Sequence, residues 1–295
     1  PAGTHTTDPF MKILQHMVMC LVLLGTCDLA AQEVMQKASR TDERSFGKGI
    51  SGVSVYGEKA TVTVRGTAVS ELKVLLRPVS RNRNKELAVA DLKYIHYSAE
   101  KEGDILVIRN SFRGQPEQIT SNLSMEIEII MPSSLPVSIT NLYGPVEAGN
   151  LASMTANVSF GSLRLTDIGS ATTVTARYSD MELTSIRGKA DIKAEKSDIL
   201  MTALGAATVI NCSYGTANLE LAGSGPLIVK GYRTTVNISL DEPGKFQYAL
   251  KAPQGRIIMS DGKQYRNQPV EVIPQVPAGL IDVTTSYCDI TIAKK

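Results

Sequence analysis

Apolar residues recur at a nearly constant interval through the second half of the chain. Similar passages restart at this interval between positions 143 and 232, each opening on an aromatic residue or a lysine. The opening residues are Tyr143, Phe160, Tyr178, Lys196, Tyr214 and Tyr232. A constant short period of this kind is typical of a repeat protein in which each repeat packs only on its neighbours.

Four apolar columns appear when the passages are aligned on their opening residues. Two columns lie three and five residues after the opening, and this spacing of two is the period of a β-strand. The columns contain Val146, Leu163, Met181, Ile199 and Ala217; then Ala148, Leu165, Leu183, Met201 and Leu219; then Leu151, Ile168, Ile186, Leu204 and Ala222; and, four before the next opening, Ala156, Val174, Ile192, Ile210 and Ile228. Glycines between the column groups indicate turns.

This pattern predicts an all-β chain folded as a parallel β-helix, or β-solenoid, with about 18 residues per coil. Stacking the coils at about 4.8 Å turns the columns into continuous interior rows. We expect a right-handed coil, because parallel crossovers are overwhelmingly right-handed. A left-handed hexapeptide β-helix, the fold of some acyltransferases, is the rival. It needs a third aliphatic column, which falls on Ser162, Asp180, Asp198 and Thr216.

The region before the repeats alternates polar and apolar residues without the period of the repeats. Four stretches have a strand pattern: 53–66, 71–79, 103–110 and 124–132. We interpret residues 32–142 as a β-rich N-terminal cap, because an uncovered solenoid end exposes core and strand edges. Residues 143–295 form the predicted solenoid. Its register shifts by one after Tyr232, and irregular coils then lead to a last regular one that opens on Tyr287.

The first 31 residues are typical of an export leader. Met17 to Leu24 is an uninterrupted apolar run, too short for a membrane span, and small residues follow at Ala30 and Ala31. We therefore expect a signal peptide and a location in the periplasm or on the outer cell surface. Leu24 to Cys27 also resembles a lipobox. If Cys27 were lipidated, the lipid would anchor the protein to a membrane, and we expect no other membrane attachment.

Composition narrows the classes of function. The formal net charge is +2, which is far from the basic balance of nucleic-acid-binding proteins, so we expect no nucleic-acid partner. After the leader only His96 remains among histidines, which disfavours histidine-based catalysis and metal binding. Cys212 and Cys288 fall in different columns several coils apart, so we expect both thiols to be unpaired.

Several stretches resemble the putative-adhesin family of bacterial exported proteins (DUF4097), which is close to the adhesin-like GIN domains. The carriers are the segment from Met125 to Leu151, the coils that follow it, and the terminal YCDITI motif. The resemblance extends over about residues 50–292. Asp180 and Asp198 keep the Asp of the family's Gly-Asp-Val opening, while Gly161 keeps its Gly. The resemblance implies a β-helix, an envelope location and no established catalysis.

The opening column is the leading candidate binding site. Phe160, Tyr178, Tyr214 and Tyr232 would form an aromatic ladder that binds sugar rings or a partner protein. The alternative is that the ladder only covers the solenoid edge and stabilises each coil by ring stacking.

Two smaller clusters are weaker candidates. Asp180 and Asp198 should be neighbours that hold a cation, act as an acid/base pair, or only hydrogen-bond the local backbone. Calcium generally needs six or more oxygens. The basic run of Arg77, Arg81, Arg83 and Lys85 either contacts an anionic polymer or lipid headgroups, or is a solvated loop.

These features together predict a non-enzymatic exported β-solenoid that binds or scaffolds in the bacterial envelope. We expect no catalytic residues and no cofactor, with an envelope glycan or protein as partner. A carbohydrate-active β-helix enzyme and a solenoid that polymerises end to end are the alternatives.

Overall fold

The computed structural model describes residues 35–295, and residues 36–295 form one compact unit. The unit is all-β, as predicted, and the one α-helix among the described residues is short. That helix, α2 (Lys85–Asp91), begins where the Asn84 side chain accepts hydrogen bonds from the amides of Glu86 (2.7 Å) and Leu87 (3.2 Å). The predicted leader, including Cys27, lies outside the described residues.

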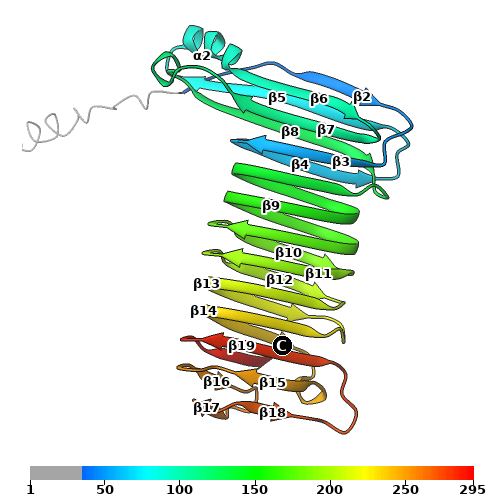
Figure 1. Cartoon of the computed structure of the whole chain (residues 1–295), viewed down its shortest axis with the longest axis vertical. Helices are drawn as coiled ribbons and strands as arrows, with labels where there is room; N and C mark the ends of the chain where they lie inside the picture. The colour runs from blue at the N-terminus through cyan, green and yellow to red at the C-terminus, as the bar shows by residue number, and fades with distance from the viewer. Residues whose placement is uncertain (1–34) are drawn as a thin grey trace, which may run out of the picture. The chain divides into compact units, whose positions relative to one another are not determined.

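The repeats form successive coils whose strands pair in parallel (Figure 1). Their strands are β9 (Val137–Arg177), β10 (Asp180–Ile186), β11 (Lys189–Glu195), β12 (Ile199–Leu204), β13 (Thr208–Leu221) and β14 (Leu227–Leu240). Met181 pairs with Leu163 on one side and with Ile199 on the other, which are the equivalent positions of the preceding and following repeats. The structure therefore confirms the predicted period.

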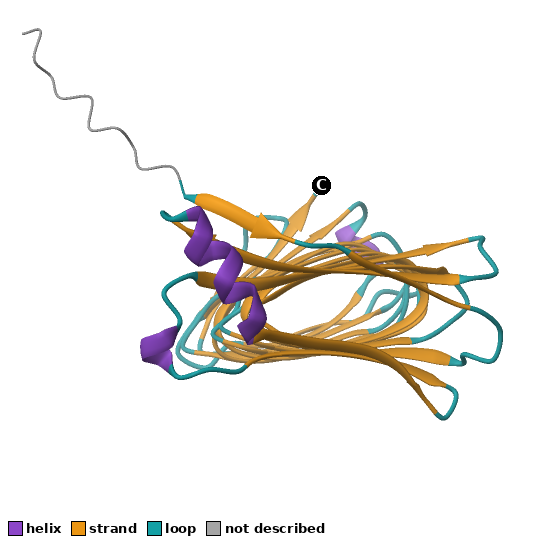
Figure 2. Cartoon of the chain, turned by 90° about the horizontal axis from the view of Figure 1, so that it is seen from above, coloured by secondary structure: helices purple, strands orange, loops and turns teal. Residues whose placement is uncertain are grey.

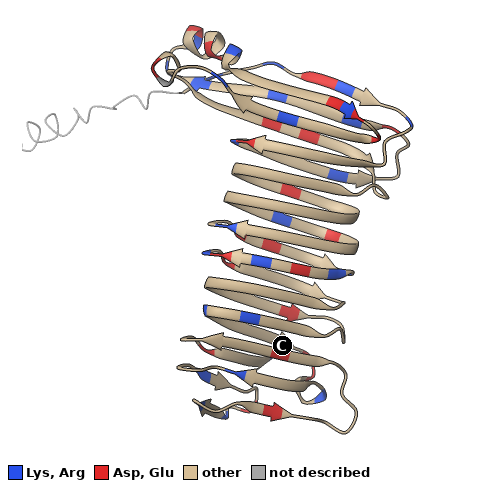
Figure 3. Ribbon diagram, in the orientation of Figure 1, with Lys and Arg blue, Asp and Glu red and all other residues tan. Residues whose placement is uncertain are grey.

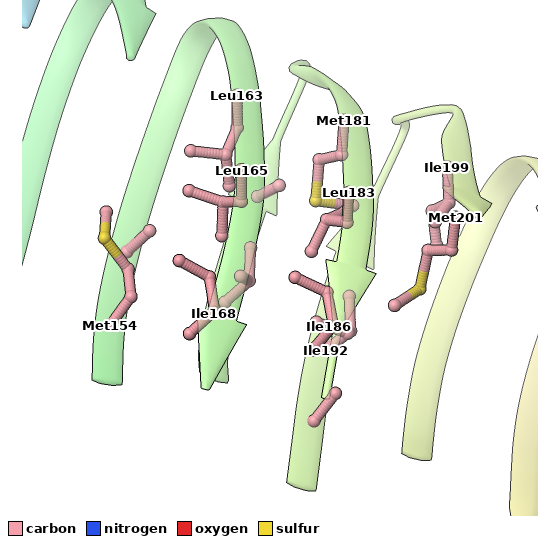
Figure 4. Close-up of a cluster of buried hydrophobic side chains, with 14 of the residues drawn as sticks. Met154, Leu163, Leu165, Ile168, Met181, Leu183, Ile186, Ile192, Ile199 and Met201 are labelled. Atoms are coloured by element: carbon pink, nitrogen blue, oxygen red, sulfur yellow. The ribbon is translucent and has the colours of Figure 1, made fainter. Parts of the chain in front are cut away.

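Aliphatic side chains of equivalent positions fill the interior between two layers of strands (Figures 2 and 4). Leu165, Leu183 and Met201 are stacked in register and are completely buried. Burying each such side chain stabilises the fold by about 1.5–3 kcal/mol, and each coil adds several. Within the repeats the interior rows contain no large aromatic residue, whereas Phe246 and Tyr248 are buried near the C-terminal end of the stack.

The coil that runs from Tyr214 to Arg233 departs from the predicted columns. Ala222 is exposed, and Leu221 instead pairs with Leu204 and is buried. Later in the same coil Val229, not Ile228, pairs with Ile210, because this coil is one residue longer than the coils before it. The one-residue shift predicted after Tyr232 is confirmed, but it begins earlier, before Val229.

The coil stack begins within the predicted cap. Strands β3 (Gly52–Glu58) and β4 (Ala60–Thr67) form a coil that pairs in parallel with residues 137–149 of β9. On its other side lie β7 (Ile105–Phe112) and β8 (Asn122–Pro132), also parallel. The outermost coil is thus later in sequence than the coil beneath it. β9 runs through residue 142 without a break, and the predicted domain boundary there remains a prediction.

Antiparallel strands cover this outermost coil. β5 (Leu72–Asn82) pairs with β8, and β6 (Ile95–Glu102) pairs with β7. β1 (Gln36–Ser39) and β2 (Asp42–Phe46) then pair with the far edge of β5. The parallel edges that would otherwise be open are therefore occupied.

The C-terminal end repeats this inverted order. The coil of β19 (Leu280–Ser286) and β20 (Ile290–Lys294) lies between β14 and the coil of β15 (Gln247–Lys251) and β16 (Arg256–Ile258). Antiparallel strands β18 (Val270–Val272) and β17 (Gln264–Arg266) then pair with β15 and β16. At each end, therefore, the outermost coil is not the first or last in sequence. β3 and β4 lie beneath the outermost coil at the N-terminal end, and β19 and β20 lie beneath it at the C-terminal end.

Candidate functional site

The opening column lies at a corner of the coils from β3–β4 to β15–β16 and has left-handed backbone geometry. The corner residues share φ values from 45° to 65°, a region that is unfavourable for residues other than glycine. They are Lys59, Tyr143, Phe160, Tyr178, Lys196, Tyr214, Arg233, Tyr287 and Gln254, in stacking order. We call this set the corner ladder. Its period explains the sequence restarts, because each coil must turn at the same place.

The residue that follows each corner is small because the next coil passes close to it. A Cβ on Gly161 would lie 2.1 Å from the carbonyl oxygen of Gly144, and one on Gly215 would lie 2.3 Å from that of Ser197. Where serine stands instead, its hydroxyl is used. The Ser179 hydroxyl donates to the Arg177 carbonyl (2.8 Å) and accepts from the Gly161 amide (3.1 Å). This internal row fixes the corners rigidly in register.

The part of the corner ladder from Tyr143 to Lys196, which we call the upper part, contains a stack of nearly parallel rings. The rings of Tyr143 and Phe160 lie 5.2 Å apart, and those of Phe160 and Tyr178 lie 5.0 Å apart. Lys196 closes the stack, with its Nζ 4.8 Å from the Tyr178 ring centroid and donating to the Tyr178 hydroxyl (2.7 Å). This hydrogen bond raises the pKa of Lys196.

The lower part is arranged around a guanidinium group. Tyr232 lies edge-on to Tyr214 (5.5 Å, 83°) and to Tyr287 (5.9 Å, 85°). Arg233 lies within 5.4–5.9 Å of all three ring centroids. Arg233, not Tyr232, holds the left-handed corner, so the interpretation of Tyr232 as an opening residue is wrong by one position. Sequence analysis considered only Tyr232, and because this coil is one residue longer the corner falls on the residue after it.

The corner ladder is exposed but presents ring edges. The six aromatic residues from Tyr143 to Tyr287 are 42–51% exposed. In the upper part, neighbouring rings at about 5 Å cover the faces of Phe160. A sugar that binds by lying flat on a ring needs a free face, so the upper part offers phenol hydroxyls, ring edges and an ammonium group instead.

Asp180 and Asp198 lie next to each other, as predicted, and each carboxylate accepts a hydrogen bond from a backbone amide of the following coil. Asp180 accepts from the Asp198 amide (3.2 Å), and Asp198 accepts from the Thr216 amide (2.7 Å). Asp289 stands in the same column and does the same for Arg256 (2.8 Å), and its ion pair with that arginine lowers its pKa. The geometry of this repeated contact matches the structural alternative for these aspartates.

The remaining candidates are dispersed. Arg77 is paired with Glu126 (2.8 Å), and Arg81 donates to Ser124 (3.3 Å), so these two residues of the basic run belong to β5 of the cap sheet. Arg83 follows the end of β5, and Lys85 begins α2. Cys212 and Cys288 are both free thiols, as predicted. Within residues 35–295 no three His, Cys, Asp or Glu side chains are grouped as metal ligands. No helix among the same residues is long and apolar enough to cross a membrane.

A groove lies beside the corner ladder and was not predicted from the sequence. It has a volume of about 580 Å³ and crosses the last strand of four successive coils. Two outward columns flank it, the first containing Thr175, Lys193, Asn211 and Lys230, and the second Arg177, Glu195, Ser213 and Tyr232. The first column lies three residues before each corner. Placing the corner at Tyr232 moved Lys230 out of register and hid the column.

Comparisons with known proteins found neither a matching family model nor a matching curated protein. Several solved structures align over most of the chain at low similarity. One titled a putative adhesin from Bacteroides fragilis is 10% identical over 87% of this chain and 97% of its own, with a TM-score of 0.38. A putative lipid binding protein from Parabacteroides distasonis is also 10% identical, over 86% and 96%, with a TM-score of 0.39. A putative cell adhesion protein from Clostridium sporogenes is 12% identical over 88% and 100%, with a TM-score of 0.28. Similarity at this level carries no argument about function, and membership of the DUF4097 family stays a prediction.

Proposed function

We propose that this chain is a non-catalytic binding module of the bacterial envelope, built as a right-handed β-solenoid that presents one edge to its partner. The observation that carries the proposal is the corner ladder itself. Six aromatic side chains that are 42–51% exposed lie along a single edge; five belong to the corner ladder and the sixth, Tyr232, lies beside it, with Lys196 between Tyr178 and Tyr214. Isolated exposed aromatic residues are ordinary, whereas a contiguous row of them is typical of a recognition surface.

The corner geometry favours binding over a purely structural role. A left-handed residue other than glycine costs roughly 1–2 kcal/mol, and glycine would relieve this strain at every corner. Ring stacking returns only about 0.5–1.5 kcal/mol per pair. Lys196 and Arg233 occupy corners of the same geometry, where they interrupt the ring stack with positive charges. A row of mixed aromatic and cationic side chains is better suited to contacting a partner than to maximising stability.

The aspartate geometry supports the non-catalytic part of the proposal. A β-helix glycan lyase or hydrolase needs carboxylates directed at substrate. Asp180 and Asp198 instead hold backbone amides of the next coil. The polymer alternative is disfavoured because antiparallel strands already pair with the outermost coil at each end.

The test is binding of the full chain to an array of envelope glycans and to purified envelope proteins. We expect a specific ligand whose affinity falls in the double variant Tyr178→Ala/Tyr214→Ala. The matched control is Leu200→Ala/Val89→Ala, which removes two apolar side chains of similar exposure (45% and 55%) away from the ladder. A cooperative unfolding transition in each variant would show that both are folded. Binding that the tyrosine variant leaves unchanged would make the corner ladder a packing feature.

A further inference from the structure

The groove beside the corner ladder has unpaired positive charge on one side. Arg177 and Glu195, in the second column, form an ion pair with each other (2.8 Å). Lys193 and Lys230, in the first column, are exposed and form no ion pair with any residue in the described part of the chain. The groove therefore offers two free ammonium groups beside one neutralised pair.

The lysines recur at a regular interval along the coil axis. The strand registers place Lys193, Asn211, Lys230, Thr284 and Lys251 on consecutive coils. A lysine therefore occupies every second coil, and neighbouring lysines are about 9.6 Å apart at a strand spacing of about 4.8 Å.

This column differs from the rest of the coil surface, where basic and acidic side chains are interspersed (Figure 3). No acidic residue stands in the column itself. Asp191 precedes Lys193 by two residues, but it does not line the groove. The positive charge along the groove is therefore not cancelled from within its own row.

The other lining groups are uncharged and polar, or aromatic. Asn211, Ser213 and Thr175 supply hydroxyl and amide groups, and Tyr232 closes the lower end. Tyr232 is the member of the aromatic row that also lines the groove. Hydroxyl and amide groups hydrogen-bond sugar hydroxyls, while regularly spaced ammonium groups pair with regularly spaced carboxylates. Groups of this kind, on an open groove that follows the coil axis, are complementary to an extended strand and not to a compact ligand.

We propose that this groove binds a strand of acidic polysaccharide, with Lys193 and Lys230 pairing with its carboxylates and Lys251 extending the contact beyond the groove. The inference rests on the proposed binding role and names the ligand class for the surface beside the corner ladder. Arg233, which lies 5.7 Å from the centroid of the Tyr232 ring, places a further positive charge where the groove and the ladder meet.

The experiment measures binding of the full chain to an oligogalacturonate long enough to span four coils. The fully methyl-esterified form of the same oligosaccharide is the ligand control, because it keeps the sugar backbone and removes the charge. We expect binding of the acidic form only, weakening as salt is added. Equal binding of both forms would overturn the proposal, and so would equally tight binding of inorganic polyphosphate, which would indicate charge attraction without glycan recognition.

The variant Lys193→Gln/Lys230→Gln should bind the acidic oligosaccharide about tenfold more weakly, equivalent to about 1.4 kcal/mol. Lys93→Gln/Lys101→Gln, which removes two exposed lysines of the cap region, makes the same change in net charge and should bind like the unmodified chain. Equal loss in both variants would show that net charge alone drives binding and would overturn the site.

The tyrosine variant separates this inference from the proposed function. Acidic glycan binding that survives the Lys193/Lys230 change but not Tyr178→Ala/Tyr214→Ala would overturn the groove and keep the corner ladder as the site. If the unmodified chain binds another ligand through the corner ladder but does not bind the oligogalacturonate, the groove proposal fails and the proposed binding function stands. If it binds no glycan and no envelope protein, both proposals fail.

Discussion

The ring of Phe160 lies parallel to the ring of Tyr178, with centroids 5.0 Å apart and planes inclined by only 8°, although a full coil separates the two residues in sequence. The separation of the rings follows from the strand spacing, because both residues hold the same corner of consecutive coils. The stack therefore presents ring edges to solvent in this part, whereas Tyr232, turned by 83° from Tyr214, interrupts the stacking next to the groove.

Stacking should make Phe160 and Tyr178 energetically coupled. In a double-mutant cycle with Phe160→Leu and Tyr178→Leu, we expect a coupling free energy of about 0.5–1.5 kcal/mol. Urea denaturation of the four proteins measures it. A coupling near zero would mean that the rings contact each other without stabilising the fold, and would leave recognition as their only role.

Removal of the Asp198 carboxylate should destabilise the fold by about 1–2 kcal/mol, because the Thr216 amide loses its acceptor at 2.7 Å. Asp198→Asn keeps a carbonyl oxygen and should recover part of the stability lost in Asp198→Ala. Denaturation midpoints of the two variants test the order. A melting temperature that rises with added calcium in the unmodified chain, but not in Asp198→Asn, would restore the metal-binding interpretation.

The close passage of consecutive coils should make glycines unequal. Gly215→Ala places a Cβ 2.3 Å from the Ser197 carbonyl oxygen, so we expect a loss of on the order of 1–3 kcal/mol. Gly205→Ala meets its nearest atom only at 4.0 Å and should change stability by less than about 1 kcal/mol. Thermal denaturation of the pair measures the difference. Similar stabilities would contradict the tight spacing at the corners.

Burial of Cys212 should make stability fall at high pH. Burial raises the pKa of this thiol from 9.0 to about 11, so the folded chain retains a proton that the unfolded chain releases. The stabilisation is complete below pH 9 and is lost as the pH rises through about 11, an effect on the order of 2 kcal/mol.

The comparison uses urea denaturation between pH 8 and 11 with the unmodified chain and Cys212→Ala. Alanine occupies the equivalent position in the two preceding coils, at Ala176 and Ala194, and should fit. We expect a shallower decline in the variant over this range. Identical declines would show that Cys212 ionises equally easily in both states. Burial also raises the pKa of Tyr248 to about 12, but its effect in both proteins is the same.

Much of the repeat architecture could be predicted from the sequence because its physical cause is local and repeated. Leu165, Leu183 and Met201 show a strand period within each coil and a constant period between coils, and both survive in the structure. The shift before Val229 could not be placed, because Tyr232 and Arg233 were both able to hold the corner. Backbone geometry, not side-chain type, decides between them.

The ends and the groove were harder for a different reason. The coil of β3 and β4 has no neighbour one period away in sequence, since its partners begin at Ile105 on one side and at Val137 on the other. The groove depends on outward residues whose identity varies from Thr175 to Lys230, so it leaves no apolar period. Of the candidate site, the aromatic row and the adjacency of Asp180 and Asp198 were readable. The role of those aspartates was left open among several alternatives, and their hydrogen bonds to the following coil match the structural one.

The insertion of β19 and β20 between two other coils has a mechanical consequence. In an ordinary stack, a terminal coil can be peeled away by breaking one interface, strand by strand. Here, a pull on residues 280–294 must shear parallel hydrogen bonds to β14 and to β15 and β16 at the same time. The inverted order should therefore make the C-terminal end of the chain resistant to tension.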